Sequence, residues 1–511
     1  MTDATLPPDQ FLYGRKGPWP QPSPSHPLIE AYEVLNIPPI ETLLWNATIG
    51  ERLLKTQVGY PPVAAGLAAK NIETTTPTDA EFATMMFTTS YQRYLQPISV
   101  EDSELLEREN IRFGGGGQTF KYDFRAMGLV EPLAGMYCAG TQVFISGSPA
   151  GKLVVEGIRV NGMMVTPANQ AWGLAKIYAL QGAAYHMLFV VHPALHFPMD
   201  SVNAITKTAV PHTHLLFQLL YPHTSYTLAL DNAVLEGPES VVNENARGSW
   251  FDPLTGNAYN LKLLFAAGYA GVPDQPYSKS YPAYDYMRPQ LLKLKDSPPS
   301  PVFDTPYSRW LTAYYERAFL PFCEAIAFAI LEADPKDSYV TRWARYLNQC
   351  VRGFPDEKQI LDLKCLAQVL AIYMWDVTVS HGADHYSFAM NVPPVYKYLR
   401  IRRAPPTSPD DPPVAPGQIF TGDDLYRSEM AQAMFFMPSA IPPNLDQTYY
   451  AFTSPLLWVV QEGFHNNLDA VSTDKTLTQY MPLKAVEPPP PLEPGQTQVP
   501  YALTIPASIQ F

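Results

Sequence analysis

Histidine is scarce in this chain, and most of its copies gather in two short stretches. Of the 10 histidines in 511 residues, six lie between positions 186 and 223 and two more at positions 381 and 385. The neutral imidazole is the commonest metal ligand among side chains, and its concentration in uncharged, apolar segments requires an explanation. The pattern indicates that two separate segments supply histidines to one metal ion.

His381 and His385 form the more regular of the two groups. Residues four apart on an α-helix project from the same face, one turn from each other, so both imidazoles can reach one ion. A bare H-x-x-x-H pair is more often a pair of packed core histidines than a metal site. The second histidine-rich segment, and the lack of any matching pair of carboxylates or cysteines, favour the metal.

The first group is spaced less regularly. His186 and His192 lie roughly 120° apart around a regular α-helix, whereas His192 and His196 share a face. Pro193 removes one backbone donor and leaves the carbonyl of Phe189 without its usual partner. We therefore expect a kink or π-bulge between positions 186 and 192, which would turn both rings toward one ion.

Helices must carry most of these residues. Apolar periodicity predicts helices at residues 28–37, 80–95, 170–197, 201–221, 308–333, 337–352, 357–388 and 422–435. Short strands are predicted at residues 118–124, 141–146, 152–158 and 225–230, the last from the alternating run YTLAL. The expected class is mainly α with a small β element.

The composition favours one large helical body. Apolar residues make up 46% of the chain and charged residues only 16%, which indicates much interior relative to surface. Proline-rich breaks at 296–306, 404–417 and 487–496 suit surface connections within one domain. We expect a proline-rich arm at residues 1–28 and a single domain at residues 29–511.

Charge, cysteines and targeting signals narrow the functional classes. The net charge of −13 argues against nucleic acid, whose binding needs a basic face. Four scattered cysteines suit a reducing compartment and no signal peptide is visible, so a cytoplasmic location is expected by default. Residues 177–199 could span a bilayer by length, but three histidines and the mid-helix Pro193 favour a buried central helix over a transmembrane segment.

The region around the first histidine group resembles the central signature of the lipoxygenases. Residues 172–176 (WGLAK) are followed by the three histidines described above, then by His214 and the Pro222-His223 pair. The family shows a similar order of a WxxAK element, a histidine-rich helix and an "LLxPH" segment.

Two further regions resemble the same family. Trp375, His381 and His385 reproduce a tryptophan, a histidine six residues later and a ligand four residues beyond it. Residues 505–511 (IPASIQF) look like the family ending "(V/I)PNSI-x-I", whose terminal carboxylate binds iron. Residues 500–511 contain no charged side chain, which is typical of a buried tail.

The resemblance implies a large single helical domain of the lipoxygenase catalytic-domain type, without an N-terminal β-barrel domain. It implies a non-haem iron dioxygenase that inserts O₂ into a polyunsaturated fatty acid, or a related 1,4-diene chain, to give a hydroperoxide. One iron per chain is expected, with manganese the less expected metal. A small lipid and O₂ are the implied partners, whereas the oligomeric state is not indicated.

The ligand set implied by the resemblance is His186, His192, His381, His385 and the carboxylate of Phe511. An ungapped alignment places Val191 where the second ligand of the first helix should lie, so the choice between His192 and His196 stays open. Two other functions also stay open. One is a metal-dependent isomerase or dehydratase acting on a lipid or polyketide-like chain, and the other is a catalytically silent lipid-binding protein of the same fold.

Overall fold

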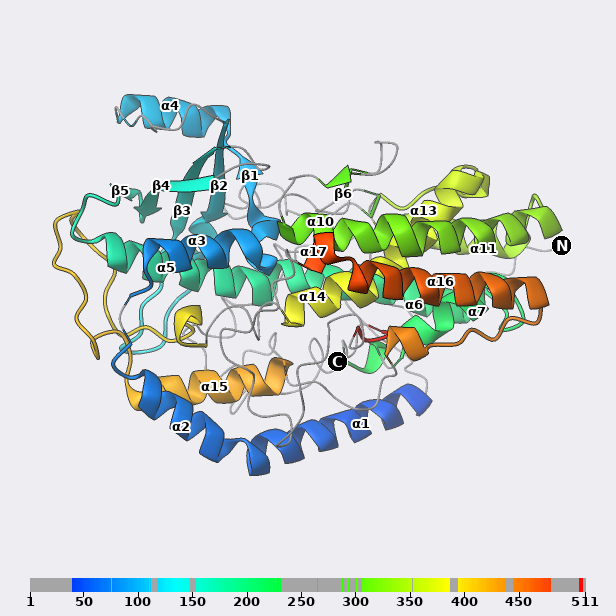
Figure 1. Ribbon diagram of the computed structural model, residues 1–511, viewed down its shortest axis with the longest axis horizontal. Coiled ribbons are helices and arrows are strands. Elements are labelled where there is room, and N and C mark those ends of the chain that lie inside the picture. Colours follow the sequence, from blue (N-terminus) through cyan, green and yellow to red (C-terminus); the bar gives the residue numbers. More distant parts are fainter. Residues whose placement is uncertain are drawn as a thin grey trace, which may run out of the picture.

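Helices dominate the fold, and several of the longest run along the long axis of the molecule (Figure 1). The expected arm at residues 1–28 and the predicted helix at 28–37 lie outside the described residues, so the division into arm and body stays a prediction. The computed structural model describes residues 39–74, 76–109, 111, 118–147, 153–225, 227–230, 264, 286–287, 292–293, 300–301, 306–351, 353–386, 394–436, 444–478 and 505–508.

Fifteen α-helices are described, and they include every helix that the histidine pattern requires. They are α1 (Pro39–Leu54), α2 (Pro61–Asn71), α3 (Asp79–Thr88), α4 (Val100–Arg108), α5 (Trp172–His186), α6 (His192–Ala209), α7 (Leu215–Leu220), α10 (Pro306–Tyr314), α11 (Leu320–Ala333), α12 (Ser338–Cys350), α13 (Leu363–Trp375), α14 (His381–Tyr386), α15 (Gly422–Phe436), α16 (Pro455–Thr473) and α17 (Lys475–Thr478).

Short irregular helical turns connect many of these helices. Single π-helical turns are η1 (Lys55–Gly59), η4 (Met187–Val191), η6 (Tyr315–Phe319) and η8 (Asp376–Ser380). Turns of 3₁₀ helix are η2 (Ser90–Tyr94), η3 (Arg125–Leu129), η5 (Tyr221–His223), η7 (Gln359–Leu361), η10 (Pro394–Lys397) and η11 (Leu445–Gln447). Three of the π turns join two α-helices into one continuous run: α5 to α6, α10 to α11 and α13 to α14.

The first residues of several helices are recognisable caps. Thr78 begins α3 and Ser99 begins α4, each in a capping box whose side chain accepts from the backbone N–H three residues later. Asp337 and Asp362 cap α12 and α13 in the same way with a carboxylate. These bonds satisfy donors that a helix leaves without partners at its first turn.

The β element is a five-stranded antiparallel meander at one end of the molecule (Figure 1). Its strands, in spatial order, are β1 (Gln96–Pro97), β2 (Gln118–Phe124), β3 (Thr141–Gly147), β4 (Leu153–Val160) and β5 (Met163–Val165). A separate two-stranded pair joins β6 (Leu292–Lys293) to β7 (Ser300–Pro301). The strands predicted at 118–124, 141–146 and 152–158 are confirmed.

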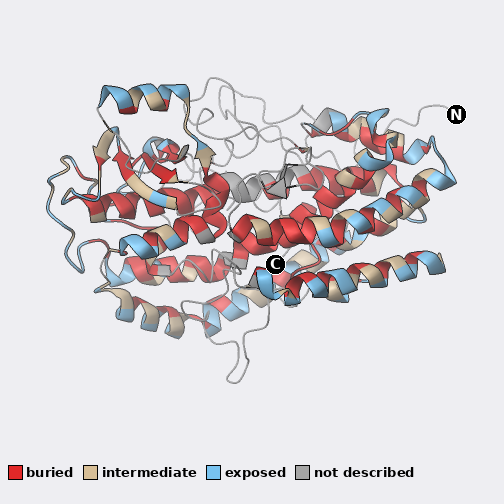
Figure 2. Ribbon diagram, turned by 45° about the horizontal axis from the view of Figure 1, so that its top comes forward, coloured by how far each residue is buried: buried red, intermediate tan, exposed pale blue. Residues whose placement is uncertain are grey.

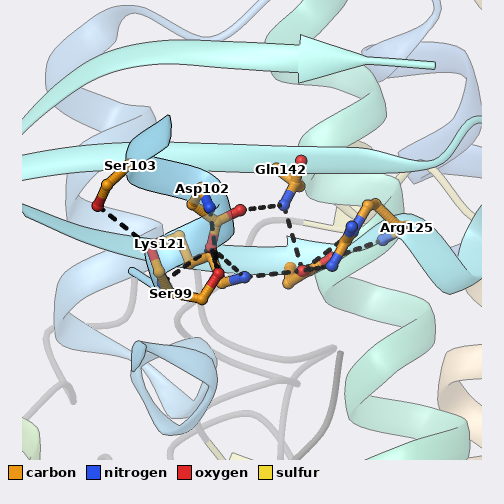
Figure 3. A network of polar contacts seen from close by, with 7 residues as sticks. Ser99, Asp102, Ser103, Lys121, Arg125 and Gln142 are labelled. Carbon is orange, nitrogen blue, oxygen red and sulfur yellow. Dashed lines mark hydrogen bonds and ion pairs between the residues drawn. The ribbon is translucent and has the colours of Figure 1, made fainter. Parts of the chain in front are cut away.

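A buried charge network ties α4 to this sheet (Figure 3). Lys121 of β2 lies between two carboxylates, with its Nζ 2.6 Å from Asp102 and 3.2 Å from Asp123. Gln142 of β3 donates to Asp102 at 3.3 Å, and Arg125 pairs with Asp123 at 2.6 Å. Because each buried charge has an opposite partner, the network joins α4 to two strands without an isolated ion.

Helix α5 packs against the sheet at unusually close range. A Cβ atom built on Gly182 would lie 2.6 Å from the Cβ of Phe124, which is far inside van der Waals contact. Glycine is therefore required at this position of α5. The close approach brings the Phe124 ring against the end of α5, where the first clustered histidine lies.

Two hydrophobic cores lie at the two ends of the molecule. One surrounds the sheet, α3 and α5, and the other is formed by α6, α7, α10 to α13 and α16. Figure 2 shows buried residues concentrated in the central helices, with stripes of exposed residues on the outer ones. The α5–η4–α6 run passes from the first core into the second, because Phe189 belongs to one and Met199 to the other.

The central helices are buried on nearly all sides. Almost every residue of α5 is buried, as are the described side chains of 177–199, in agreement with the expected central helix. The run Leu363–His385 is also long and apolar enough to cross a membrane, by length and composition alone, but most of it is buried inside the protein. A helix that is apolar all round is typical of a large core.

One predicted strand is wrong, and two predicted helices are divided. Residues 227–230 of the expected strand are helical. They contact α6, since the Asn203 side chain donates to the Thr227 hydroxyl at 2.5 Å. The backbone groups of a helix bond within the helix, so α6 offers no edge to which a strand could hydrogen-bond. The helix predicted at 80–95 is α3 followed by the 3₁₀ turn η2, with Thr89 extended between them. The helix predicted at 201–221 is two helices, because α6 ends at Ala209 and α7 begins only at Leu215.

Candidate metal centre

The two runs that carry the clustered histidines have the same construction. In each run a π-helical turn ends immediately before a histidine: η4 before His192 and η8 before His381. A π turn inserts one residue into the helix and changes the direction in which the following side chains point. The π-bulge predicted between positions 186 and 192 is confirmed, whereas the turn before His381 was not predicted.

The structure brings His196, His381 and His385 together. The Nε2 atoms of His196 and His381 lie 2.9 Å apart, with ring centroids separated by 4.7 Å and planes inclined at 81°. The rings of His381 and His385 have centroids 4.5 Å apart. All three side chains are buried. The i, i+4 pair and one histidine of the first group therefore form one cluster between α6 and α14.

Burial keeps this cluster in the form that binds metals. Desolvation lowers the pKa of His196 to about 3, and desolvation followed by the nearby His196 and Arg52 lowers the pKa of His385 well below its usual value. The His196 and His385 imidazoles are therefore neutral near pH 7, so each has a nitrogen lone pair to offer. In the contact at 2.9 Å, one ring donates its N–H to the lone pair of the other.

The spacing of the His196–His381 pair suits a shared ion. Two ligands at right angles, each about 2.1 Å from a metal, are about 3 Å apart. The observed separation of 2.9 Å is close to that value. Within the described part of the chain, no three His, Cys, Asp or Glu side chains already surround one point as a complete site. The donor chemistry and this spacing fit a metal that enters between α6 and α14.

The other predicted ligands are placed differently. The His186 ring, at the end of α5, packs against Tyr94 with centroids 4.8 Å apart and against Phe124 with centroids 5.1 Å apart. The backbone of His192 begins α6, but its side chain lies outside the described residues, as does Phe511. His196 was the open alternative in the sequence, and its i, i+4 spacing from His192 was the available signal.

The segment that leads toward Phe511 is threaded into the second core. Ile505, Ala507 and Ser508 are buried, and the backbone N–H of Leu445 donates to the Ile505 carbonyl at 2.7 Å. Pro506 forms an isolated antiparallel bridge with Asn444. The described part of the predicted buried tail is therefore inside the protein.

His223 holds this segment through one ring nitrogen and contacts Tyr450 through the other. Its Nδ1 bonds to the Ala507 carbonyl, and its Nε2 lies 3.0 Å from the Tyr450 hydroxyl. A carbonyl only accepts, so Nδ1 carries the proton and Nε2 accepts from Tyr450. Desolvation lowers the pKa of His223 to about 4, although the bond to Ala507 acts in the opposite direction. His223 therefore has a structural role that its place in the motif did not reveal.

His214 is also structural. Its Nδ1 accepts from the Leu216 backbone N–H at 3.1 Å and thereby caps α7. Its Nε2 then carries the proton and donates to the Asp337 carboxylate at 2.7 Å. Asp337 in turn caps α12, so one histidine joins the first turns of two helices.

Known proteins share this arrangement of helices and sheet. No family model matches the chain. The polyunsaturated fatty acid lipoxygenase ALOX12 of Mus musculus is 25% identical over 358 residues, which are 62% of this chain and 49% of the mouse protein. The chain thus spans about half the length of this relative.

Solved lipoxygenase structures match over most of the chain. One, crystallised anaerobically in complex with arachidonate, covers 96% of this chain and 79% of its own, with a TM-score of 0.66 and 15% identity. The manganese lipoxygenase of Gaeumannomyces graminis covers 84% of this chain and 85% of its own, with a TM-score of 0.59 and 15% identity.

The fold is that of a lipoxygenase catalytic domain, which confirms the expected mainly α class with its small sheet. The sequence is similar to that of the mouse lipoxygenase, and the fold is shared with the solved lipoxygenase structures.

Proposed function

We propose that this chain is a non-haem iron dioxygenase that inserts O₂ into a polyunsaturated fatty acid, or a related 1,4-diene chain, to give a hydroperoxide. The observation that carries the proposal is the 2.9 Å contact between His196 and His381, two buried imidazoles from separate helices of a lipoxygenase fold. The mouse relative and the structure with arachidonate bound support a fatty-acid substrate.

The proposed ligands combine the sequence pattern with the observed cluster. His381 and His385 supply one side of the site, and His186 and the Phe511 carboxylate remain predicted ligands. The position that the sequence left open is the second ligand of the first helix, which is either His192 or His196. The contact with His381 favours His196. Iron is the proposed metal and manganese the alternative, which the likeness to a manganese lipoxygenase keeps in view.

When bound, such a metal supplies the one-electron oxidation that weak doubly allylic C–H bonds require. The histidines would hold the metal as neutral nitrogen donors and leave one coordination position open. Leu188, Phe189 and Leu195 are buried along the same run, where they exclude water and offer an apolar lining to an acyl chain.

The test is elemental analysis of the purified protein combined with oxygen uptake on linoleate. We expect close to one equivalent of iron, or less readily manganese, together with O₂ consumption and a conjugated hydroperoxide product. Metal without O₂ uptake, but with conversion of an added lipid hydroperoxide, would identify the isomerase or dehydratase instead. Less than about a tenth of an equivalent of either metal, after growth with both supplied, would leave only the silent lipid-binding protein.

A further inference from the structure

A buried ion pair lies beside the histidine cluster, between parts of the chain that are far apart in sequence. Arg93 of η2 donates from Nε to Oδ1 of Asp384 at 2.7 Å, and the two side chains are 2% and 0% exposed. Asp384 is the neighbour of His385 on α14. Guanidinium keeps its charge at every pH at which proteins fold, so this buried cation requires the carboxylate.

The same guanidinium also binds the turn that precedes the ligand helix. Its Nη2 donates to the Ser380 carbonyl at 3.1 Å and to the Ser380 hydroxyl at 2.7 Å. Ser380 is the last residue of the π turn η8, directly before His381. Tyr307 of α10 adds a hydroxyl donor 3.3 Å from Asp384. Arg93 thus contacts both the end of the π turn and the first turn of α14.

The position of Asp384 on α14 determines how its contact with Arg93 affects the neighbouring histidines. At about 100° per residue, Asp384 lies about 60° around the helix from His381 and about 100° from His385. The carboxylate therefore stands beside the ligand face without occupying it. Because the Arg93 guanidinium binds both Asp384 and Ser380, it constrains the rotation of α14 about its axis. That rotation determines the direction in which both imidazoles point.

The next residue of η2 reaches the other histidine-bearing run. Tyr94 packs on the His186 ring at the end of α5, with centroids 4.8 Å apart. Adjacent residues of one 3₁₀ turn therefore contact the α5 run and the α14 run. η2 links the two segments between which the metal is proposed to bind.

We propose that Arg93 is a positioning residue that fixes the rotation of α14, so that His381 and His385 face His196 across the metal. The inference rests on the proposed function, because it assigns Arg93 a role only if these histidines bind a metal. Lysine cannot replace arginine here, since a single ammonium lacks the planar fork that spans Asp384 and Ser380.

The experiment separates positioning from simple stability. The variants are Arg93→Met, the charge-free pair Arg93→Met with Asp384→Leu, and Arg93→Lys. The matched control is Arg400→Met, which removes another buried arginine paired with an aspartate, Asp424, at 2.9 Å. For each full-length protein, the melting temperature and the apparent dissociation constant for Fe²⁺, from competition with a chelator, are measured.

Arg93→Met should lower the melting temperature, because it leaves the Asp384 charge buried and unpaired. The charge-free pair should regain most of that stability but still bind Fe²⁺ about 10- to 100-fold more weakly than the wild type, as expected when a group that orients ligands is lost. Arg93→Lys should fold nearly normally and show weakened Fe²⁺ binding. The control should lose stability and keep its Fe²⁺ affinity.

Recovery of both stability and Fe²⁺ affinity in the charge-free pair would overturn the proposal, because the ion pair would then be a stability element only. Wild-type affinity in a folded Arg93→Lys protein, or equal weakening in the Arg400→Met control, would overturn it as well. A wild-type protein that binds no Fe²⁺ would instead refute the proposed function itself, and Arg93 would lose its role with it.

Discussion

The clustered histidines of this protein have different roles. His196 and His381 face each other across the candidate centre, whereas His214 caps a helix and His223 fastens a distant segment. All of them lie in apolar surroundings, so the sequence alone could not separate ligands from structural groups. The deciding information is which atoms each ring nitrogen meets.

Replacement of single histidines by alanine should rank them by role. We expect His196→Ala, His381→Ala and His385→Ala to lose most of the metal, because each removes a nitrogen donor from the cluster. His192→Ala should keep more metal than His196→Ala, since the contact with His381 favours His196 for the open position of the first helix. Metal content of the folded variants decides. A His192→Ala protein without metal beside a fully loaded His196→Ala protein would assign that position to His192.

His223 should make stability depend on pH in a defined window. Its pKa is lowered from 6.5 to about 4 in the folded protein. Between these two pH values the unfolded chain is therefore protonated at His223 while the folded chain is not. The stabilisation is complete above pH 6.5 and is lost as the pH falls toward 4. Over that window the loss is about 3 kcal/mol for this one group.

The measurement compares urea unfolding of the wild type and of His223→Asn from pH 7.5 to pH 4. The wild type should be the more stable protein at pH 7.5, because the variant disturbs buried partners at Ala507 and Tyr450. The difference should shrink as the pH falls, since only the wild type carries this histidine. A difference that is constant across the window would show that His223 titrates normally.

At the scale of elements, the sequence predicted the helices and strands whose apolar residues repeat regularly. The strands at 118–124 and 141–146 and the long helical runs match the structure because their apolar residues repeat with the period of the element. The run YTLAL has a strand-like alternation, but its described residues 227–230 are helical, and the neighbouring helix α6 offers no edge to which a strand could hydrogen-bond. Local pattern could not supply that neighbour.

Other elements carried weaker signals. Helices α1, α2, α4 and α16 were not predicted, and several of their apolar residues face outward, such as Leu43 and Leu456. The π turn η8 was also missed, because no proline marks it as Pro193 marks η4. Arg93 and Asp384 are 291 positions apart, and no spacing rule connects them.

The packing of α5 on the sheet should tolerate no side chain at Gly182. Gly182→Ala places a methyl group 2.6 Å from the Phe124 Cβ, so α5 or β2 must move, at a cost of about 1–3 kcal/mol. Gly66→Ala on α2 is the matched control, because nothing lies within 4 Å of the added Cβ. That control should gain up to about 1 kcal/mol from helix propensity. Thermal melts of both variants test the contrast, and equal effects would contradict it.

At the scale of the whole molecule, we propose that the tail leading to Phe511 completes the candidate centre. Residues 505–508 are fixed by Leu445 and His223, and the Phe511 carboxylate is a predicted ligand just beyond them. Addition of one glycine after Phe511 keeps every packing side chain but displaces that carboxylate. We expect greatly weakened iron binding and no turnover, with stability changed mainly through loss of metal. Full occupancy and normal turnover would remove the carboxylate from the site.

The sequence separation of these contacts has a consequence for biosynthesis. Arg93 bonds to a residue 291 positions later in the sequence, and His223 bonds to one 284 positions later. A nascent chain that emerges from the ribosome therefore carries an unmatched arginine through most of translation. Contacts between residues so far apart in sequence form slowly, because the entropy of closing a long loop is lost before the contact can stabilise it. We therefore expect the proposed metal to be captured only after most of the chain has been synthesised.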